Sequence, residues 1–287
     1  MIAIATTKAD VRSAIGQARH EGMTVGFVPT MGALHDGHLS LVRAARARFD
    51  FVVASIFVNP TQFGPGEDFQ RYPRRIEIDT ELLSEDGASL VWTPGVREMY
   101  RSDAEATVDP GPLAARWEGE VRPGHFSGVA TIVTKMLSVI RPDAAFFGEK
   151  DFQQLAVVRR VERDLDLHVE IVGCPTVRDT DGLALSSRNA YLSAEDRVAA
   201  LALPLALQAA ENELVLGNHA HALEAAMRSA AREHAGDALA LDYAAIVDPD
   251  TLEPLERVVA TARAIIAGRV GSTRLLDNRE LRPSASS

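Results

Sequence analysis

The chain reads Pro29-Thr30-Met31-Gly32-Ala33-Leu34-His35-Asp36-Gly37-His38 between two segments of different character. Residues 25–28 before it are apolar, whereas residues 39–49 after it place their apolar side chains on one helical face. This order predicts a strand, a loop and a helix. The next run, residues 51–58, is almost wholly apolar and predicts a strand covered on both faces. Together the pieces predict a βαβ unit with a parallel strand pair.

The two histidines of this motif, His35 and His38, are expected at the carboxyl edge of the sheet, where the helix begins. Unpaired N–H groups and the positive end of the peptide dipoles attract phosphate at such a helix start. Gly32 and Gly37 allow the backbone to turn tightly and to approach a ligand. Because imidazole donates to a phosphoryl oxygen without a permanent charge, the motif predicts a phosphate site.

Two other interpretations of the histidine pair are open from these residues. A His-x-x-His spacing occurs in zinc sites, although the chain has one cysteine, Cys174, and no cluster of further ligands near the pair. The pair would otherwise be ordinary surface or helix-capping histidines. The strand before them, the glycines among them and the helix after them favour the phosphate site.

Length and composition are typical of a soluble globular protein. The 287 residues suffice for one large or two ordinary domains, and 46% are hydrophobic while 24% are charged. The N-terminus is charged and no apolar run reaches spanning length, so neither a signal peptide nor a membrane anchor is expected. The single cysteine excludes an internal disulfide and fits a reducing cytoplasm.

The charge pattern argues against nucleic acid as a partner and draws attention to one lysine. The net charge is −10 at pH 7, without a block of basic residues. Only three of the 30 basic residues are lysine, namely Lys8, Lys135 and Lys150. Lys150 follows an apolar strand predicted at 144–147, and therefore lies at the edge where open α/β sheets bind ligands. A compact point charge is useful there.

Turn-rich segments follow the other predicted strands and helices. Residues 59–68 form a long loop at the histidine edge, and its Asn59 and Gln62 carry amides that can bind an organic acid. Residues 122–128 open a helix with regularly spaced apolar side chains that extends to Ile140.

The polar segment 178–189 is predicted to be the hinge between two domains, 1–176 and 177–287. Within it, Ser186, Ser187 and Arg188 place two hydroxyls and a guanidinium in a row, a set that can bind several phosphate oxygens. The second domain is expected to be a small α+β fold. Its predicted elements are a helix capped by Ser193 and running to about Leu216, a helix at 220–233, strands at 243–247, 258–267 and 271–277, and a disordered tail at 282–287.

Histidines after one strand, a lysine after another and a Ser-Ser-Arg loop are typical of enzymes that break ATP between its α- and β-phosphates. Attack on the α-phosphorus builds negative charge on the non-bridging oxygens and on the departing pyrophosphate. Donors placed there beforehand stabilise that charge. The three groups are therefore expected to meet around one triphosphate.

Six segments occur in an order that is specific to one family. They are residues 29–38, Phe57-Val58-Asn59-Pro60-x-Gln62-Phe63, Tyr72-Pro73-Arg74, Arg122-Pro123-Gly124-His125-Phe126, residues 147–154 and residues 181–189. Through them the chain resembles the pantoate–β-alanine ligase family over nearly its whole length.

The resemblance implies a Rossmann-like, doubly wound parallel sheet of the His-x-Gly-His nucleotidyltransferase type, with a smaller α+β C-terminal lid domain. It implies ATP-dependent condensation of (R)-pantoate with β-alanine through a pantoyl adenylate, with Mg²⁺ as cofactor and AMP and pyrophosphate as products. It also implies a homodimer. The binding partners that it implies are these small molecules, and neither nucleic acid nor a membrane is expected among them.

The resemblance further implies residue roles. The catalytic residues around the phosphates would be His35, His38, Lys150, Ser186, Ser187 and Arg188. Pantoate would contact Gln62, Gln154, Pro29 and Met31. The remaining ATP contacts, which include Met31 again, would be Thr30, Gly32, Gly37, Gly148, Glu149, Asp151, Val177 and Leu185. The expected magnesium ligand is Asp79.

Two positions depart from the family pattern. Many relatives have methionine where this chain has Thr61, a change expected to loosen the pantoate pocket slightly. Ile78 precedes Asp79 where acidic pairs occur, so the segment around the expected magnesium ligand matches weakly. The alternatives are another small-molecule adenylyl- or cytidylyltransferase, against which the paired glutamines argue, and a nucleotide-sensing module without catalysis.

Overall fold

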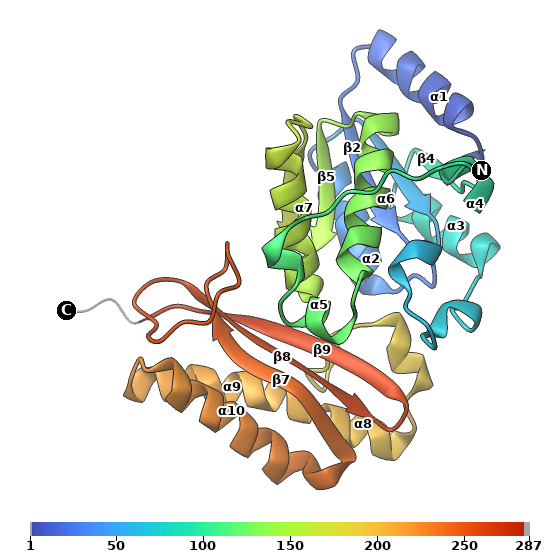
Figure 1. Ribbon diagram of the computed structural model, residues 1–287. Helices are drawn as coiled ribbons and strands as arrows, with labels where there is room; N and C mark the ends of the chain where they lie inside the picture. The colour runs from blue at the N-terminus through green and yellow to red at the C-terminus, as the bar shows by residue number, and fades with distance from the viewer. Residues whose placement is uncertain (1, 284–287) are drawn as a thin grey trace. The chain divides into compact units, whose positions relative to one another are not determined.

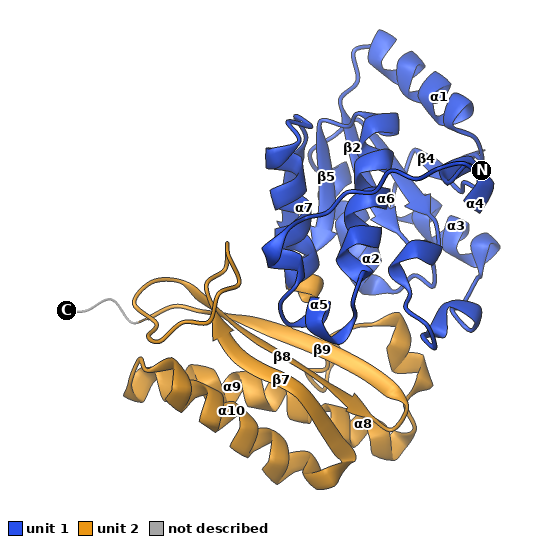
Figure 2. Ribbon diagram, viewed as in Figure 1, with its two compact units in different colours: residues 1–149, 153–175 blue, residues 150–152, 176–287 orange. Residues whose placement is uncertain are grey.

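The computed structural model describes residues 2–283 and divides the chain into two compact units (Figures 1 and 2). Unit 1 comprises residues 1–149 and 153–175, and unit 2 comprises residues 150–152 and 176–287. The second unit thus includes a tripeptide from the middle of the sequence. Of the tail predicted to be disordered, residues 284–287 lie outside the described part of the chain.

The first unit is built on a six-stranded sheet with the order β1-β4-β3-β2-β5-β6. Every neighbouring pair is parallel, which confirms the predicted α/β class. The strands are β1 (Ala3–Ala5), β2 (Val25–Thr30), β3 (Phe51–Ile56), β4 (Leu90–Trp92), β5 (Ala144–Gly148) and β6 (Glu170–Cys174).

Helices cover both faces of this sheet (Figure 1), because successive strand side chains point to opposite sides. Phe27 and Phe147 belong to the core on one face, while Val28 and Phe146 belong to the core on the other. The first core includes side chains of α1 (Lys8–His20), α6 (His125–Ile140) and α7 (Phe152–Asp164), and the second those of α2 (Asp36–Arg46) and α3 (Ile76–Glu85). The doubly wound arrangement is therefore confirmed.

The structure contains two N-terminal elements that the sequence patterns did not predict, β1 and α1. Strand β1 has three residues and one buried side chain, too few for a pattern to be visible. Helix α1 buries only Val11, Ile15 and Ala18, a narrow stripe in an otherwise polar segment. Thr7 caps this helix by accepting the Asp10 N–H at 3.1 Å.

The second unit packs three helices against a three-stranded antiparallel sheet with the order β7-β8-β9. The predicted cap is confirmed, since Ser193 Oγ accepts the Asp196 N–H at 3.0 Å. The helix predicted to run on to Leu216 is two helices, with Leu201 between them. The elements are α8 (Ala194–Ala200), α9 (Ala202–Leu216), α10 (Ala220–Ala235), β7 (Leu239–Val247), β8 (Ala262–Val270) and β9 (Thr273–Leu281).

Among residues 2–283, the segment 194–216 is long and apolar enough to cross a membrane by length and composition alone. The prediction that no apolar run reaches spanning length is therefore wrong by this criterion. Core helices of globular domains meet the same criterion, and Leu203, Leu207 and Ala210 of this segment are buried in the core of the second unit. The buried side of this segment packs against α10, β8 and β9, while Val198, Leu205, Val215 and Leu216 are exposed.

Candidate active site

The strand order of the first unit reverses at β2. From β2 the chain adds β3 and β4 on one side, and it then places β5 and β6 on the other side. A crevice outside the carboxyl ends of two such strands is the usual ligand site of an open α/β sheet. The loop with the histidines starts at the end of β2, and Gly148 and Glu149 lie at the end of β5. Both segments thus begin at the switch point.

The loop after β2 makes a left-handed turn before the first histidine. Gly32 has φ +80° and Ala33 has φ +52°, a region that only glycine adopts without cost. Thr30 Oγ1 donates to the Ser55 carbonyl at 2.7 Å and accepts the Gly32 N–H at 3.2 Å. The end of β2 is therefore tied both to β3 and to the turn.

Asp79 of α3, the expected magnesium ligand, binds this turn. Its side chain is fully buried, and its two carboxylate oxygens accept the Ala33 N–H at 2.9 Å and the Leu34 N–H at 3.0 Å. A Cβ at position 32 would lie 2.9 Å from Asp79 Oδ2, so glycine is needed there. Both oxygens are committed to the backbone, and Asp79 does not fit a magnesium site in this structure.

No group of three or more His, Cys, Asp or Glu side chains within residues 2–283 is arranged to hold a metal ion. The zinc interpretation of the histidine pair therefore has no support from neighbouring ligands.

The two histidines meet at the first turn of α2. His35 occupies the N-cap position in an extended conformation, with φ −140° and ψ 174°. The His38 N–H donates to the His35 carbonyl at 2.8 Å. The two ring centroids are 4.1 Å apart, and the ring planes are inclined by 42°. Both imidazoles thus lie where the helix offers its first N–H groups.

The loop after β3 places two predicted pantoate contacts together. Gln62 ends the short 3₁₀ helix η1 (Pro60–Gln62) and is 8% exposed. Its Nε2 lies 3.0 Å from Met31 Sδ, in the loop after β2. A ligand at the ends of β2 and β3 can contact both side chains.

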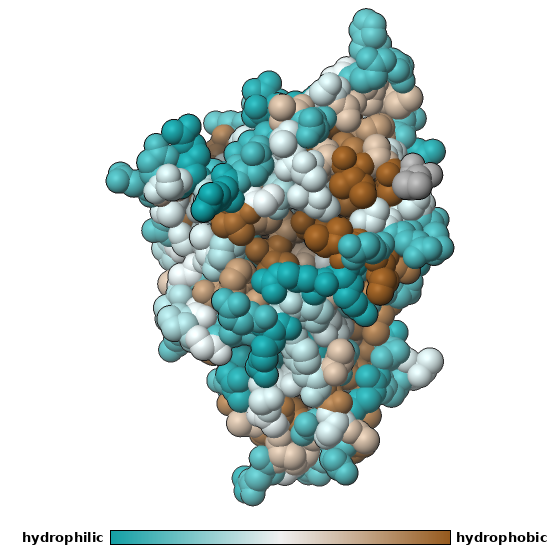
Figure 3. Space-filling model, turned by 90° about the vertical axis from the view of Figure 1, so that its right-hand side faces the viewer, coloured by the Kyte–Doolittle hydropathy of each residue, from teal (hydrophilic) through white to brown (hydrophobic). Residues whose placement is uncertain are grey.

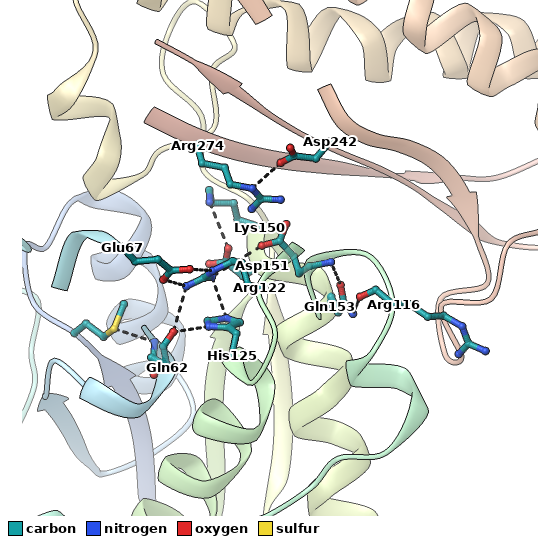
Figure 4. A network of polar contacts seen from close by, with 12 residues as sticks. Gln62, Glu67, Arg116, Arg122, His125, Lys150, Asp151, Gln153, Asp242 and Arg274 are labelled. Atoms are coloured by element: carbon teal, nitrogen blue, oxygen red, sulfur yellow. Dashed lines mark hydrogen bonds and ion pairs between the residues drawn. The ribbon is translucent and has the colours of Figure 1, made fainter. Parts of the chain in front are cut away.

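A polar cluster that was not predicted from the sequence surrounds the backbone carbonyl of Gln62 (Figure 4). Arg122 forms a bidentate ion pair with Glu67 at 2.7 and 2.8 Å, and its Nη2 donates to the Gln62 carbonyl at 3.2 Å. His125 Nδ1 lies 2.8 Å from the same carbonyl oxygen. The turn-rich segment 122–128 was noted in the sequence, but nothing local indicated its partners.

These contacts determine the protonation of His125. Since a carbonyl oxygen only accepts, Nδ1 carries the proton, and Arg122 Nη1 donates to Nε2 at 3.2 Å. Burial, together with the positive charge of Arg122, lowers the pKa of His125 to about 4. The imidazole is neutral at pH 7.

We expect acidification to destabilise the protein through His125. With a pKa of about 6.5 unfolded and about 4 folded, the unfolded state takes up the proton first. The full stability is therefore present above pH 6.5 and is lost as the pH falls toward 4, by about 3 kcal/mol. Urea unfolding at several pH values measures this loss. His125→Asn should show a shallower pH dependence, and an unchanged slope would contradict the assignment.

The adjacent glutamines Gln153 and Gln154 have different surroundings. Gln153 is 7% exposed, and its Nε2 donates to the carbonyls of Leu113 and Arg116 at 3.0 and 2.8 Å. Its Oε1 accepts the Glu118 N–H at 3.1 Å. Gln154 is half-buried in the first turn of α7. Gln153 is therefore structural, which leaves Gln154 as the candidate for substrate binding.

The other predicted phosphate ligands belong to the second unit. Lys150 Nζ lies 3.4 Å from Asp151 Oδ1, and the Lys150 carbonyl accepts Asn278 Nδ2 of β9 at 2.8 Å. Ser186 Oγ accepts the Arg188 N–H at 3.3 Å and so caps a short 3₁₀ helix, Ser187–Tyr191. The Ser186 hydroxyl keeps its proton for a further acceptor.

Known proteins match the chain over nearly its whole length. A family model described as pantoate-beta-alanine ligase matches residues 3–280. This chain belongs to the pantoate–β-alanine ligase family. A pantothenate synthetase of Rhizorhabdus wittichii is 52% identical over 275 residues, which are 96% of this chain and 97% of the relative. One from Thermus thermophilus is 53% identical over 279 residues, 97% of this chain and 99% of the relative.

Solved ligase structures share the fold. The crystal structure of a pantothenate synthetase from Thermus thermophilus has a TM-score of 0.93 and 52% identity, and the match covers 98% of this chain and 100% of that one. A pantoate-beta-alanine ligase from Francisella tularensis, complexed with beta-gamma ATP and β-alanine, has a TM-score of 0.80 and 31% identity over 97% of each chain. The predicted family and fold are confirmed.

Proposed function

We propose that this ATP-dependent pantoate–β-alanine ligase works in two steps, with a pantoyl adenylate between them. A carboxylate oxygen of (R)-pantoate attacks the α-phosphorus of ATP, and the bond to the β-phosphate oxygen breaks to release pyrophosphate. The amine of β-alanine then attacks the acyl carbon and loses a proton, and AMP leaves. The observation that carries the proposal is the pair of histidine rings at the switch point, 4.1 Å apart at the start of α2.

His35 and His38 are proposed to donate to the ATP phosphates and to the charge that grows on them in the first step. Their place at a helix start supports this role, because the first N–H groups of the helix are further donors to a phosphate bound there. Gly37 allows the triphosphate to approach the backbone, and Gly32 allows the turn that precedes the histidines. Thr30 ends β2 beside them.

The remaining assignments follow the family resemblance. Lys150, Ser186, Ser187 and Arg188 would contact phosphate oxygens, since ammonium, hydroxyl and guanidinium groups all donate to them. Pantoate would bind Gln62, Gln154, Pro29 and Met31, and the Gln62–Met31 contact supports this pocket. The further nucleotide contacts would be Gly148, Glu149, Asp151, Val177 and Leu185.

We propose that Mg²⁺ arrives bound to the ATP phosphates and is not held in a cage of protein carboxylates. The commitment of both Asp79 oxygens to backbone N–H groups supports this. Mg²⁺ commonly keeps several waters and binds through substrate phosphates.

Exchange of labelled pyrophosphate into ATP tests the adenylation step. We expect exchange that requires pantoate, needs no β-alanine and gives way to net AMP formation when β-alanine is added. Absence of pantoate-dependent exchange would refute the proposal. Transfer to nicotinate mononucleotide or phosphopantetheine would instead indicate a nucleotidyltransferase, and ATP binding without AMP release under any acid and amine would indicate a sensing module.

We also propose that the enzyme is a cytoplasmic homodimer. Figure 3 shows apolar side chains gathered at the surface of one face of the molecule. The large exposed apolar side chains of the first unit include Ile4, Ile76, Ile78 and Val96. Exposed apolar surface of this kind supports a protein interface, and the single cysteine fits a reducing compartment. Sedimentation equilibrium should give twice the mass of the chain, and a monomer mass at micromolar concentration would contradict the dimer.

A further inference from the structure

We infer that Tyr100 and Thr61 orient the side-chain amide of Gln62, through Asn59, so that Gln62 acts only as a hydrogen-bond donor to an oxygen of the acid substrate. The inference rests on the proposed role of Gln62 in binding pantoate. We call these four residues the amide relay, and all of them belong to the first unit.

The first link is the amide of Asn59, which two backbone groups hold in the same orientation as the hydroxyls of Tyr100 and Thr61 do. Asn59 Oδ1 faces the Thr61 N–H at 3.4 Å, and its Nδ2 faces the Gly128 carbonyl at 3.2 Å. An N–H only donates and a carbonyl only accepts, so the oxygen and the nitrogen of this amide cannot be exchanged. Asn59 is 1% exposed, so bulk water does not compete for either atom.

A close approach of α6 makes this link possible. A Cβ at position 128 would lie 2.3 Å from the Thr61 carbonyl oxygen, so α6 reaches the loop only because residue 128 is glycine. The Gly128 carbonyl is thereby brought to Asn59 Nδ2.

The second link passes this orientation to Gln62. Asn59 Nδ2 donates to Gln62 Oε1 at 3.1 Å, which occupies the Gln62 oxygen and turns its Nε2 toward Met31 Sδ, 3.0 Å away. A thioether is a weak acceptor. A carboxylate or hydroxyl oxygen of a ligand is a much better partner for Nε2, and Gln62 offers such a ligand an N–H and no oxygen.

Two hydroxyls hold the other end of the relay. Tyr100 Oη donates to Asn59 Oδ1 at 2.8 Å, and Thr61 Oγ1 lies 3.0 Å from the same oxygen and 3.1 Å from Tyr100 Oη. Burial raises the pKa of Tyr100, so its phenol keeps the proton that it donates. The Lys135 ammonium lies 5.5 Å from the centre of the Tyr100 ring, a distance at which a cation is attracted to the ring face.

Gln62→Glu tests which atom of Gln62 meets the substrate. The variant keeps the shape, and Asn59 Nδ2 can still donate to one glutamate oxygen, but the other oxygen would replace the N–H. We expect the KM for pantoate to rise about 10- to 100-fold, because an acceptor and a charge now face the acid, while the KM for ATP stays within twofold. If Gln62 accepted from a pantoate hydroxyl instead, the KM for pantoate would hardly change, and the inference would fall.

Tyr100→Phe and Thr61→Val test the relay itself, since each removes one hydroxyl at nearly constant shape. We expect each to raise the KM for pantoate about two- to tenfold, the effect of one neutral hydrogen bond, with little change in kcat or in the KM for ATP. Thr61→Ser restores the hydroxyl and should restore the wild-type KM.

Thr134→Val on α6 is the matched control, because no described residue hydrogen-bonds to the Thr134 hydroxyl. Thermal denaturation verifies that every variant is folded. If Tyr100→Phe and Thr61→Val behave like Thr134→Val, the relay is wrong. Absence of pantoate-dependent exchange in the wild-type enzyme would instead refute the proposed function. Failure of the relay and failure of the proposed function therefore give different results.

Discussion

Replacing His38 with alanine should slow pantoate-dependent pyrophosphate exchange by roughly 10²- to 10³-fold, as expected from the loss of one preorganised donor worth about 2.7 to 4 kcal/mol in the barrier. The imidazole lies in the first turn of α2, beside His35, at the switch point of the sheet. A donor held there needs no reorganisation when charge develops on the phosphates. The loss should therefore appear mainly in kcat.

His20→Ala is the control for this substitution. His20 is an exposed histidine in the last turn of α1, and its removal should leave the exchange rate within twofold. His35→Ala should slow exchange about as much as His38→Ala. The fold-loss in rate of the double variant should be smaller than the product of the two single fold-losses, because both rings stabilise the same charge. Nearly full turnover in His38→Ala would show that this ring does not act on the phosphates.

Replacing Asp79 with alanine should lower the free energy of unfolding by about 3 to 5 kcal/mol. The substitution leaves the Ala33 and Leu34 N–H groups buried without their acceptor, in a turn where Ala33 already has φ +52°. Asp79→Asn keeps the shape but has one acceptor oxygen, and its NH₂ group would face an N–H. We expect an intermediate loss for Asp79→Asn, measured by urea unfolding.

The same variants separate the two possible tasks of Asp79. If the carboxylate holds the turn, Asp79→Asn should lose stability as well as activity, and added Mg²⁺ should restore neither. If the carboxylate were a magnesium ligand, stability would be unchanged and high Mg²⁺ would recover activity, contrary to our expectation. Glu81→Ala, at an exposed position of the same helix, should change neither quantity.

Local patterns were sufficient for most of the fold. Apolar runs separated by amphipathic segments predicted β2, α2 and β3, because side-chain periodicity records which faces are buried. The patterns failed for α1, whose three buried residues form too narrow a stripe. They also missed the break at Leu201, where both flanking segments are apolar and helical.

Sequence spacing also accounts for the meeting of His35 and His38, since residues three apart at a helix start must lie on one side. In contrast, Asp79 binds a turn 45 and 46 residues away, Tyr100 binds an amide 41 residues away, and Arg122 binds a carbonyl 60 residues away. No local pattern encodes such partners. They are chosen by the strand order and by the close approach of helices to loops, which arise only when the chain has packed.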